Sequence, residues 1–299
     1  MTSCTRREWI GTTAGTLAAI GGTAWWPAAV AAQEKKGGNI RFGLVTYQWG
    51  KDWDLPTLIT NLVKTKVIGV ELRTTHKHGV EPSLNDAERA DVRGRFVDSG
   101  VTCVGIGSDE RFDNPDPAVV KKAIEASKAF VQLSHDIGGS GVKVKPDRFW
   151  PDVPKEKTIE QIGKALNELG EFAEGFGQQI RLEVHGQCQE LPTIKAIMEV
   201  ADNPNVAVCW NSNPTDLKDA GLEANFAMVS KRFGATSHVH VLDMKDYPFA
   251  KLFDLYVAMD YEGWWLLEEG KVPSDPVAAL AEQKQLFDKM LAESRQRVG

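Results

Sequence analysis

Ile180-Arg181-Leu182-Glu183 is a short apolar run that ends on a carboxylate, and three similar runs follow it along the chain. These are Val206-Ala207-Val208-Cys209-Trp210-Asn211, His238-Val239-His240 and Trp264-Trp265-Leu266-Leu267-Glu268. The gaps between the runs are about thirty residues, the length of one strand plus one helix. In a closed α/β barrel, side chains at the carboxyl ends of strands converge where such barrels carry out their chemistry. The sequence therefore predicts a divalent-metal enzyme.

Strand-like and helix-like segments alternate through residues 39–299. The expected strands are 40–46, 67–72, 101–106, 141–145, 179–184, 206–210, 237–242 and 263–268. The expected helices are 55–64, 85–98, 117–136, 158–175, 191–201, 222–233, 250–260 and 275–294. Eight strands, each followed by a helix, predict a single (β/α)8 TIM barrel. An open doubly wound sheet is the alternative, but Gly105-Ile106-Gly107 lacks the third glycine of a phosphate-binding loop.

The first 32 residues are expected to form an export signal. Thr5-Arg6-Arg7-Glu8-Trp9-Ile10 is a twin-arginine pattern, and Ala29-Val30-Ala31 offers a cleavage site of small residues. Residues 33–38 would then be a polar linker to a barrel domain at 39–299. We therefore expect a periplasmic or extracellular protein that the twin-arginine export machinery recognises, without a membrane anchor after cleavage.

Composition limits the partners. The formal net charge is -6, and no basic cluster interrupts the acidic chain. Nucleic-acid binding and membrane-surface binding are both disfavoured by such a chain. Cys103, Cys188 and Cys209 would remain after cleavage, an odd number with no Cys-x-x-Cys pair. We expect no essential disulfide and no thiolate metal site.

The four runs supply two carboxylates, one amide and one imidazole. A polar side chain that points into a barrel is costly unless it is paired or binds a ligand. This set is rich in oxygen, which favours Mn²⁺, Mg²⁺ or Co²⁺, with Zn²⁺ possible. Each group also has an ordinary alternative: a salt bridge for Glu183, a turn for Asn211, a hydrogen-bonded core histidine for His240 and a solvated strand end for Glu268.

The chain resembles the xylose isomerase-like TIM-barrel superfamily, the sugar phosphate isomerase/epimerase group. The resemblance covers nearly all of residues 39–299. It rests on Leu182-Glu183-Val184-His185-Gly186, Cys209-Trp210-Asn211, His238-Val239-His240-Val241-Leu242-Asp243 and Tyr261-Glu262-Gly263-Trp264-Trp265-Leu266-Leu267-Glu268. The resemblance implies that Glu183, Asn211, His240 and Glu268 bind one divalent cation. It prefers His240 to His238, because the family ligand precedes an acidic residue by three, here Asp243.

The chain departs from the family pattern at three positions. Asn211 stands where the family has Asp, which should weaken metal binding and leave the cation more Lewis-acidic. The ketose 3-epimerase branch also has a Glu and a His where this chain has Gln189 and Pro214. Assignment to that branch therefore does not follow from the resemblance.

The resemblance implies a sugar isomerase or epimerase that abstracts a proton next to a carbonyl through an enediolate. Glu183 and Glu268 would flank the sugar as base and acid. A lyase that acts on 3-keto-glycosides, a sugar-binding barrel without catalysis and a DNA-repair endonuclease are the alternatives, and acidity and export argue against the last. A homo-oligomer is possible.

Further polar residues are expected near the same rim. The candidates for substrate binding are His76, His78, His185, Trp49 and Lys143, and Lys145 is a candidate catalytic residue. The lysines could bind a hydroxyl or phosphate or assist an enolate, or they could pair with Glu71 or Glu183. The alternative for His76 and His78 is that they only form hydrogen bonds within a mobile loop. Two of the four tryptophans 49, 210, 264 and 265 are expected in the core.

Overall fold

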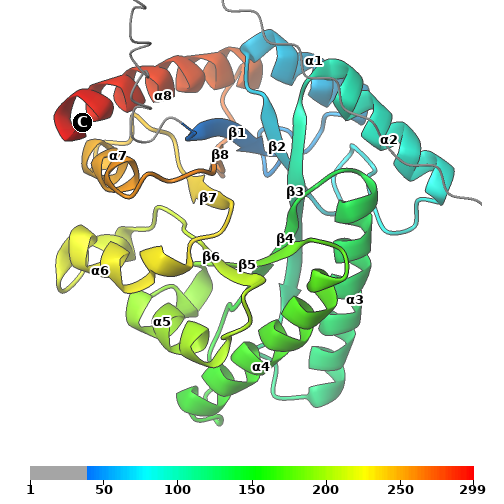
Figure 1. Ribbon diagram of the computed structural model, residues 1–299, viewed down its shortest axis with the longest axis vertical. Helices are drawn as coiled ribbons and strands as arrows, with labels where there is room; N and C mark the ends of the chain where they lie inside the picture. The colour runs from blue at the N-terminus through cyan, green and yellow to red at the C-terminus, as the bar shows by residue number, and fades with distance from the viewer. Residues whose placement is uncertain (1–38) are drawn as a thin grey trace, which may run out of the picture. The chain divides into compact units, whose positions relative to one another are not determined.

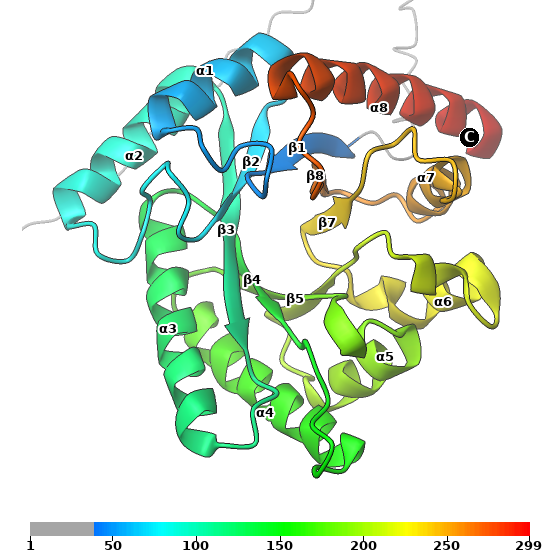
Figure 2. The same cartoon turned by 180° about the vertical axis from the view of Figure 1, so that it is seen from behind.

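The computed structural model describes residues 39–299, which form a ring of parallel strands with helices outside it (Figure 1). Figure 2 shows the same ring from the opposite side. The expected signal peptide at 1–32 and linker at 33–38 lie outside the described residues and stay predictions. None of the helices within 39–299 is long and apolar enough to cross a membrane.

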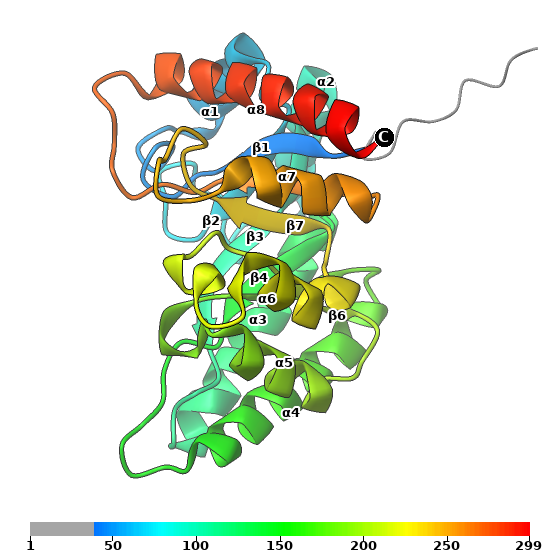
Figure 3. The same cartoon turned by 90° about the vertical axis from the view of Figure 1, so that its left-hand side faces the viewer.

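The order of elements confirms the predicted alternation. The strands are β1 (Arg41–Val45), β2 (Gly69–Arg73), β3 (Thr102–Arg111), β4 (Gly141–Lys145), β5 (Gln179–Glu183), β6 (Val206–Cys209), β7 (Thr236–Val239) and β8 (Trp264–Leu267). The helices are α1 (Leu55–Thr65), α2 (Asp86–Ser99), α3 (Pro117–Asp136), α4 (Lys155–Glu174), α5 (Leu191–Val200), α6 (Gly221–Val229), α7 (Phe249–Ala258) and α8 (Pro276–Val298). Short 3₁₀ turns are η1 (Gly186–Cys188), η2 (Pro214–Leu217) and η3 (Ser230–Arg232). In side view, helices α4 to α8 follow one another along the outside of the strands (Figure 3).

The strands pair in the order β6-β5-β4-β3-β2-β1-β8-β7, and every pair is parallel. Isolated bridges between β6 and β7, including one from Asn211 to His238, bring the two ends of this sheet together. The amide of His238 donates to the Trp210 carbonyl at 2.7 Å across this seam. The predicted (β/α)8 TIM barrel is confirmed. The contacts that close the barrel place the ends of β6 and β7 side by side. Polar side chains at these two strand ends can therefore contact each other.

Helix starts follow the expected capping chemistry. Asp54 accepts a hydrogen bond from the Thr57 amide at 3.0 Å and begins α1, as the sequence predicts. Asn85 and Glu88 form a reciprocal capping box at α2. These local contacts fix the first residue of α1 and of α2. They thereby also fix the ends of the loops after β1 and β2, which carry polar side chains at the barrel mouth.

Strand β3 is longer than the sequence predicts, because it continues past Ile106 to Arg111. The added segment pairs with β4 through Gly107 and Arg111, and the Ser108 hydroxyl donates to the Lys143 carbonyl at 2.7 Å. The apolar residues end at Ile106, whereas the hydrogen bonds between β3 and β4 continue beyond it. The strand is therefore longer than its apolar pattern. The extension carries Asp109 to the rim of the barrel.

Gly69 in β2 allows close packing inside the barrel. A methyl group on this residue would lie 2.2 Å from Cζ3 of the Trp264 ring, which is buried. We expect Gly69→Ala to lower the free energy of unfolding by about 1–3 kcal/mol, because the ring and backbone must shift. Urea unfolding followed by circular dichroism measures this loss.

Gly94→Ala in α2 is the matched control. Apart from its chain neighbours and the backbone of its own helix, no atom of residues 39–299 lies within 4 Å of the position its methyl group would take. Since glycine weakens a helix interior, this variant should gain about 0.5–1 kcal/mol. Equal effects of the two substitutions would contradict the packing argument.

Candidate metal centre

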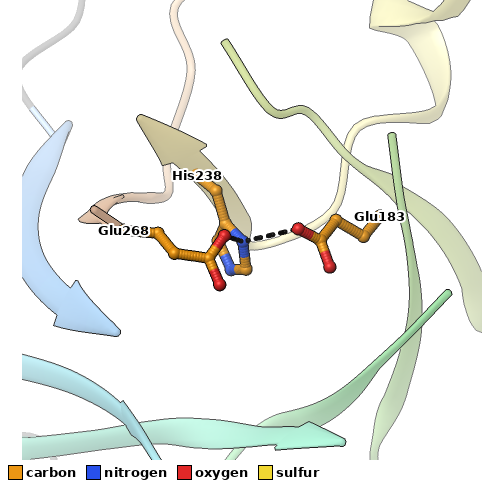
Figure 4. Close-up of side chains that lie close together, drawn as sticks. All are labelled: Glu183, His238 and Glu268. Carbon is orange, nitrogen blue, oxygen red and sulfur yellow. Dashed lines mark hydrogen bonds and ion pairs between the residues drawn. The ribbon is translucent and has the colours of Figure 1, made fainter. Parts of the chain in front are cut away.

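Three side chains from different strands meet inside the barrel mouth (Figure 4). Glu183 ends β5, His238 lies in β7 and Glu268 follows β8, and their potential ligand atoms lie within 4.8 Å of one another. His238 Nδ1 is 3.4 Å from Glu183 Oε1 and 3.0 Å from Glu268 Oε2. Glu183 and His238 are fully buried, whereas the Glu268 side chain is 12% exposed. Of these three side chains, Glu268 is the one in contact with solvent.

Asn211, which follows β6, lies beside this group. Its Nδ2 donates to Glu183 Oε1 at 3.0 Å. Its Oδ1 is buried and accepts no hydrogen bond from any residue that the structure describes. A buried amide oxygen without a donor is costly, so it is a natural position for a cation.

Two further charged residues complete the surroundings. Lys143 Nζ on β4 lies 2.8 Å from Glu183 Oε2, and both side chains are fully buried. Glu71 on β2 places Oε1 3.1 Å from His238 Nε2. The imidazole is therefore held between Glu71 on one side and the carboxylates of Glu183 and Glu268 on the other.

The pKa shifts describe an ionised cluster. Burial alone would raise the pKa of Glu183, but Lys143 and His238 outweigh it and hold that pKa well below its ordinary value. Burial alone would lower the pKa of His238, and the neighbouring Cys209, Glu268 and Glu71 raise it well above its usual range. Burial would likewise lower the pKa of Lys143, and Glu183 and Glu268 raise it. Charges of both signs are thus stable in this buried space.

These residues fit a divalent cation. Carboxylate oxygens from Glu183 and Glu268, a ring nitrogen of His238 and the free oxygen of Asn211 form a donor set from four strands. Such a mixed, mostly oxygen set suits Mn²⁺, Mg²⁺ or Co²⁺ and tolerates Zn²⁺. Glu71 beside the remaining His238 nitrogen is the kind of partner that orients a ligating imidazole.

A family model described as xylose isomerase-like TIM barrel matches residues 60–290. The chain belongs to this family. The matched range contains Glu71, Glu183, Asn211, His238 and Glu268, so the whole cluster lies on the family's barrel. A comparison with curated proteins finds no match.

Solved structures share the xylose isomerase-like barrel at low sequence identity. An L-ribulose 3-epimerase is 17% identical with a TM-score of 0.73, and the match covers 86% of this chain and 96% of that one. The 3-keto-D-glucoside 4-epimerase YcjR from E. coli is 12% identical with a TM-score of 0.71, covering 84% and 99%. The IolI protein with a binding zinc atom is 16% identical with a TM-score of 0.68, covering 87% and 99%. These likenesses support the fold.

The structure brings together three of the four expected ligands, Glu183, Asn211 and Glu268, but it places His238 with them where the family resemblance favoured His240. His240 lies beyond the end of β7 and is partly exposed, with Nδ1 3.6 Å from Glu269 Oε2. The two histidines are two residues apart, so regular strand alternation would direct both to the same face, but β7 ends between them. His238 lies deeper inside the barrel than His240. The bridge that pairs Asn211 with His238 places His238 at the level of the cluster.

The candidate residues at the rim form a separate network above the cluster. Lys145 Nζ donates to Asp109 Oδ1 at 2.9 Å, so this lysine is held at the rim and not beside Glu183. His185 Nδ1 is 2.5 Å from Asp147 Oδ1, and Arg111 pairs with the other oxygen of that carboxylate. Burial would raise the pKa of Asp147, but His185 and Arg111 lower it to about 2. This network surrounds the approach to the cluster.

The first loops hold the remaining candidates in structural contacts. Both ring nitrogens of His78 face its own loop, at 2.8 Å from the Arg73 carbonyl and 3.0 Å from the Val80 amide. His76 Nδ1 lies 3.0 Å from Thr46 Oγ1. Trp49 is buried and donates to the Lys271 carbonyl at 2.8 Å, which ties the first loop to the last. Among these three, only His76 keeps a ring nitrogen without a hydrogen bond to residues 39–299.

Three residues that complete the site receive no role from the sequence pattern. Glu71 was visible only as a polar residue on the second strand, although it contacts His238 across 167 positions of sequence. Asp109 and Asp147 stand after apolar runs. Asp109 orients Lys145, and Asp147 orients His185 and Arg111. A carboxylate inside or directly after a barrel strand is the signal that could have found all three.

Proposed function

We propose that this protein is a divalent-metal-dependent sugar isomerase or epimerase. The observation that carries the proposal is the buried group of Glu183, His238 and Glu268, with the free oxygen of Asn211, at the carboxyl end of the barrel strands. The L-ribulose 3-epimerase and keto-glucoside epimerase among its structural neighbours support the same general chemistry.

The chain supplies the groups that such a reaction needs. A divalent cation bound here would polarise the sugar carbonyl and offset the charge of the enediolate. Glu183 and Glu268 come from the non-adjacent strands β5 and β8, so one carboxylate oxygen can take the proton from the carbon beside the carbonyl and the other carboxyl group can return a proton. Glu71 keeps the His238 ring oriented. Lys145 and His185, at the rim, would bind sugar hydroxyls.

Proton exchange tests the proposal directly. Ketopentoses and ketohexoses incubated in D₂O with Mn²⁺ should gain deuterium at the carbon next to the carbonyl, together with the epimer or isomer. Mass spectrometry and chromatography measure the two products. Tight sugar binding without exchange would instead indicate a binding barrel.

A keto-glycoside is the second candidate substrate, because one structural neighbour is a 3-keto-D-glucoside 4-epimerase. The same proton abstraction next to the ketone could then lead to epimerisation or to elimination of the aglycone. A chromogenic 3-keto-glucoside separates these outcomes, since only elimination releases the coloured aglycone.

The two neighbouring histidines give a matched test of the ligand set. We expect His238→Asn to weaken Mn²⁺ binding by about 100-fold, because it removes the nitrogen that faces Glu183 and Glu268. His240→Asn should retain Mn²⁺ affinity, since that ring faces Glu269. Calorimetric titration of the metal-free proteins measures both. The reverse ranking would assign the ligand to His240.

A further inference from the structure

Lys143 is a fully buried lysine whose ammonium lies within the candidate metal centre. Its Nζ is 2.8 Å from Glu183 Oε2 and donates to the Ser108 carbonyl at 3.2 Å. The contact with Oε2 is an ion pair between two buried side chains. A buried ammonium has a large desolvation cost, and carboxylates must compensate it.

The charge count shows what this lysine does to a metal. Glu71, Glu183 and Glu268 contribute three negative charges around His238. A ligating imidazole is neutral, so Lys143 reduces the net charge of the group to two negative charges. Asn211 adds no charge at the position where an aspartate would add a third. One divalent cation therefore neutralises the group, but it must bind next to an ammonium that repels it.

Lys143 also stabilises the centre without a cation. Glu183 is a fully buried carboxylate, and Lys143 Nζ at 2.8 Å is nearer to it than the His238 ring at 3.4 Å. The ion pair with Lys143 compensates this carboxylate in the metal-free protein.

From these contacts we infer that Lys143 is a built-in counter-cation, which pairs with Glu183 in the metal-free protein and weakens metal binding at the same carboxylate. The inference rests on the proposed function, because it concerns the same centre. It predicts a weakly bound, exchangeable metal and a protein that stays folded when the metal is removed.

The test compares Mn²⁺ affinity by calorimetry in the metal-free full chain. Lys143→Met should bind Mn²⁺ at least about tenfold more tightly than the unmodified chain, because a positive charge beside the site is gone. It should also melt at a lower temperature without metal and recover with Mn²⁺. Lys143→Gln, which keeps a polar side chain, serves if the first variant does not fold. Lys145→Met is the matched control, since that lysine pairs with Asp109 and its loss should leave Mn²⁺ affinity unchanged.

The outcomes separate the lysine from the centre itself. Unchanged Mn²⁺ affinity in both Lys143 variants, with binding lost in Glu183→Gln, would overturn the role of Lys143 and leave the proposed function standing. Full binding in Glu183→Gln would place the metal elsewhere and overturn both. Absence of Mn²⁺ binding in every variant would also overturn both.

Discussion

Glu183→Gln is expected to abolish Mn²⁺ binding and to lower turnover by about 10²–10⁴-fold. Glu183 is the residue on which the centre converges, because its two oxygens contact Asn211, His238 and Lys143. The amide keeps the shape of the side chain but removes both the anionic ligand and the proton acceptor. Metal content, turnover and deuterium exchange are the measurements.

The same substitution should also destabilise the protein. Removing one partner of a buried ion pair deprives Lys143 of its nearest carboxylate, which costs about 3–5 kcal/mol. Glu269→Gln is the matched control, because that carboxylate faces His240 outside the cluster. Normal turnover in Glu183→Gln would refute the assignment of Glu183 as catalytic base or acid.

The barrel could be predicted because its signals are local. Apolar runs of four to six residues, helical spacing and caps such as Asp54 each depend on residues close together in sequence. The carboxyl ends of the late strands also follow from this pattern. Glu183, Asn211 and Glu268 could therefore be placed together without coordinates.

The depth of each side chain in the barrel could not be predicted. His238 lies in β7 and His240 follows the end of that strand, and the pairing between the ends of β6 and β7 decides which one reaches Glu183. Lys143 and Lys145 present the same ambiguity on β4, where the deeper lysine enters the cluster and the other stays at the rim. The register of paired strands depends on contacts between residues that are distant in sequence. The alternation of apolar and polar residues along one strand does not encode these contacts.

Asp216 has no role in the sequence pattern, yet the structure makes it a determinant of stability. It lies buried in η2, where Oδ2 accepts hydrogen bonds from Tyr247 at 2.6 Å and from the Asn213 amide at 2.9 Å. Its Oδ1 has no donor among the described residues. Burial raises the pKa of Asp216 to about 7, well above the ordinary value of 3.8.

A raised carboxyl pKa means that the folded state binds the proton more tightly than the unfolded state does. The stability from this group is complete below pH 3.8 and is lost as the pH rises through about 7. Between pH 5 and pH 8 the loss amounts to about 3 kcal/mol. His76 acts in the opposite direction, because burial lowers its pKa to about 4 and its contribution is lost as the pH falls.

Comparison with Asp216→Asn isolates this contribution, since His76 is the same in both proteins. The variant cannot ionise at position 216, so its stability relative to the unmodified chain should improve by about 3 kcal/mol from pH 5 to pH 8. Urea unfolding at several pH values measures the difference, and the exposed Glu282→Gln serves as the control. Parallel pH profiles for the unmodified chain and Asp216→Asn would show that Asp216 is already ionised in the folded protein. A remaining slope in the variant, with stability falling toward pH 5, is the signature expected of His76 and His78, because burial lowers the pKa of both imidazoles.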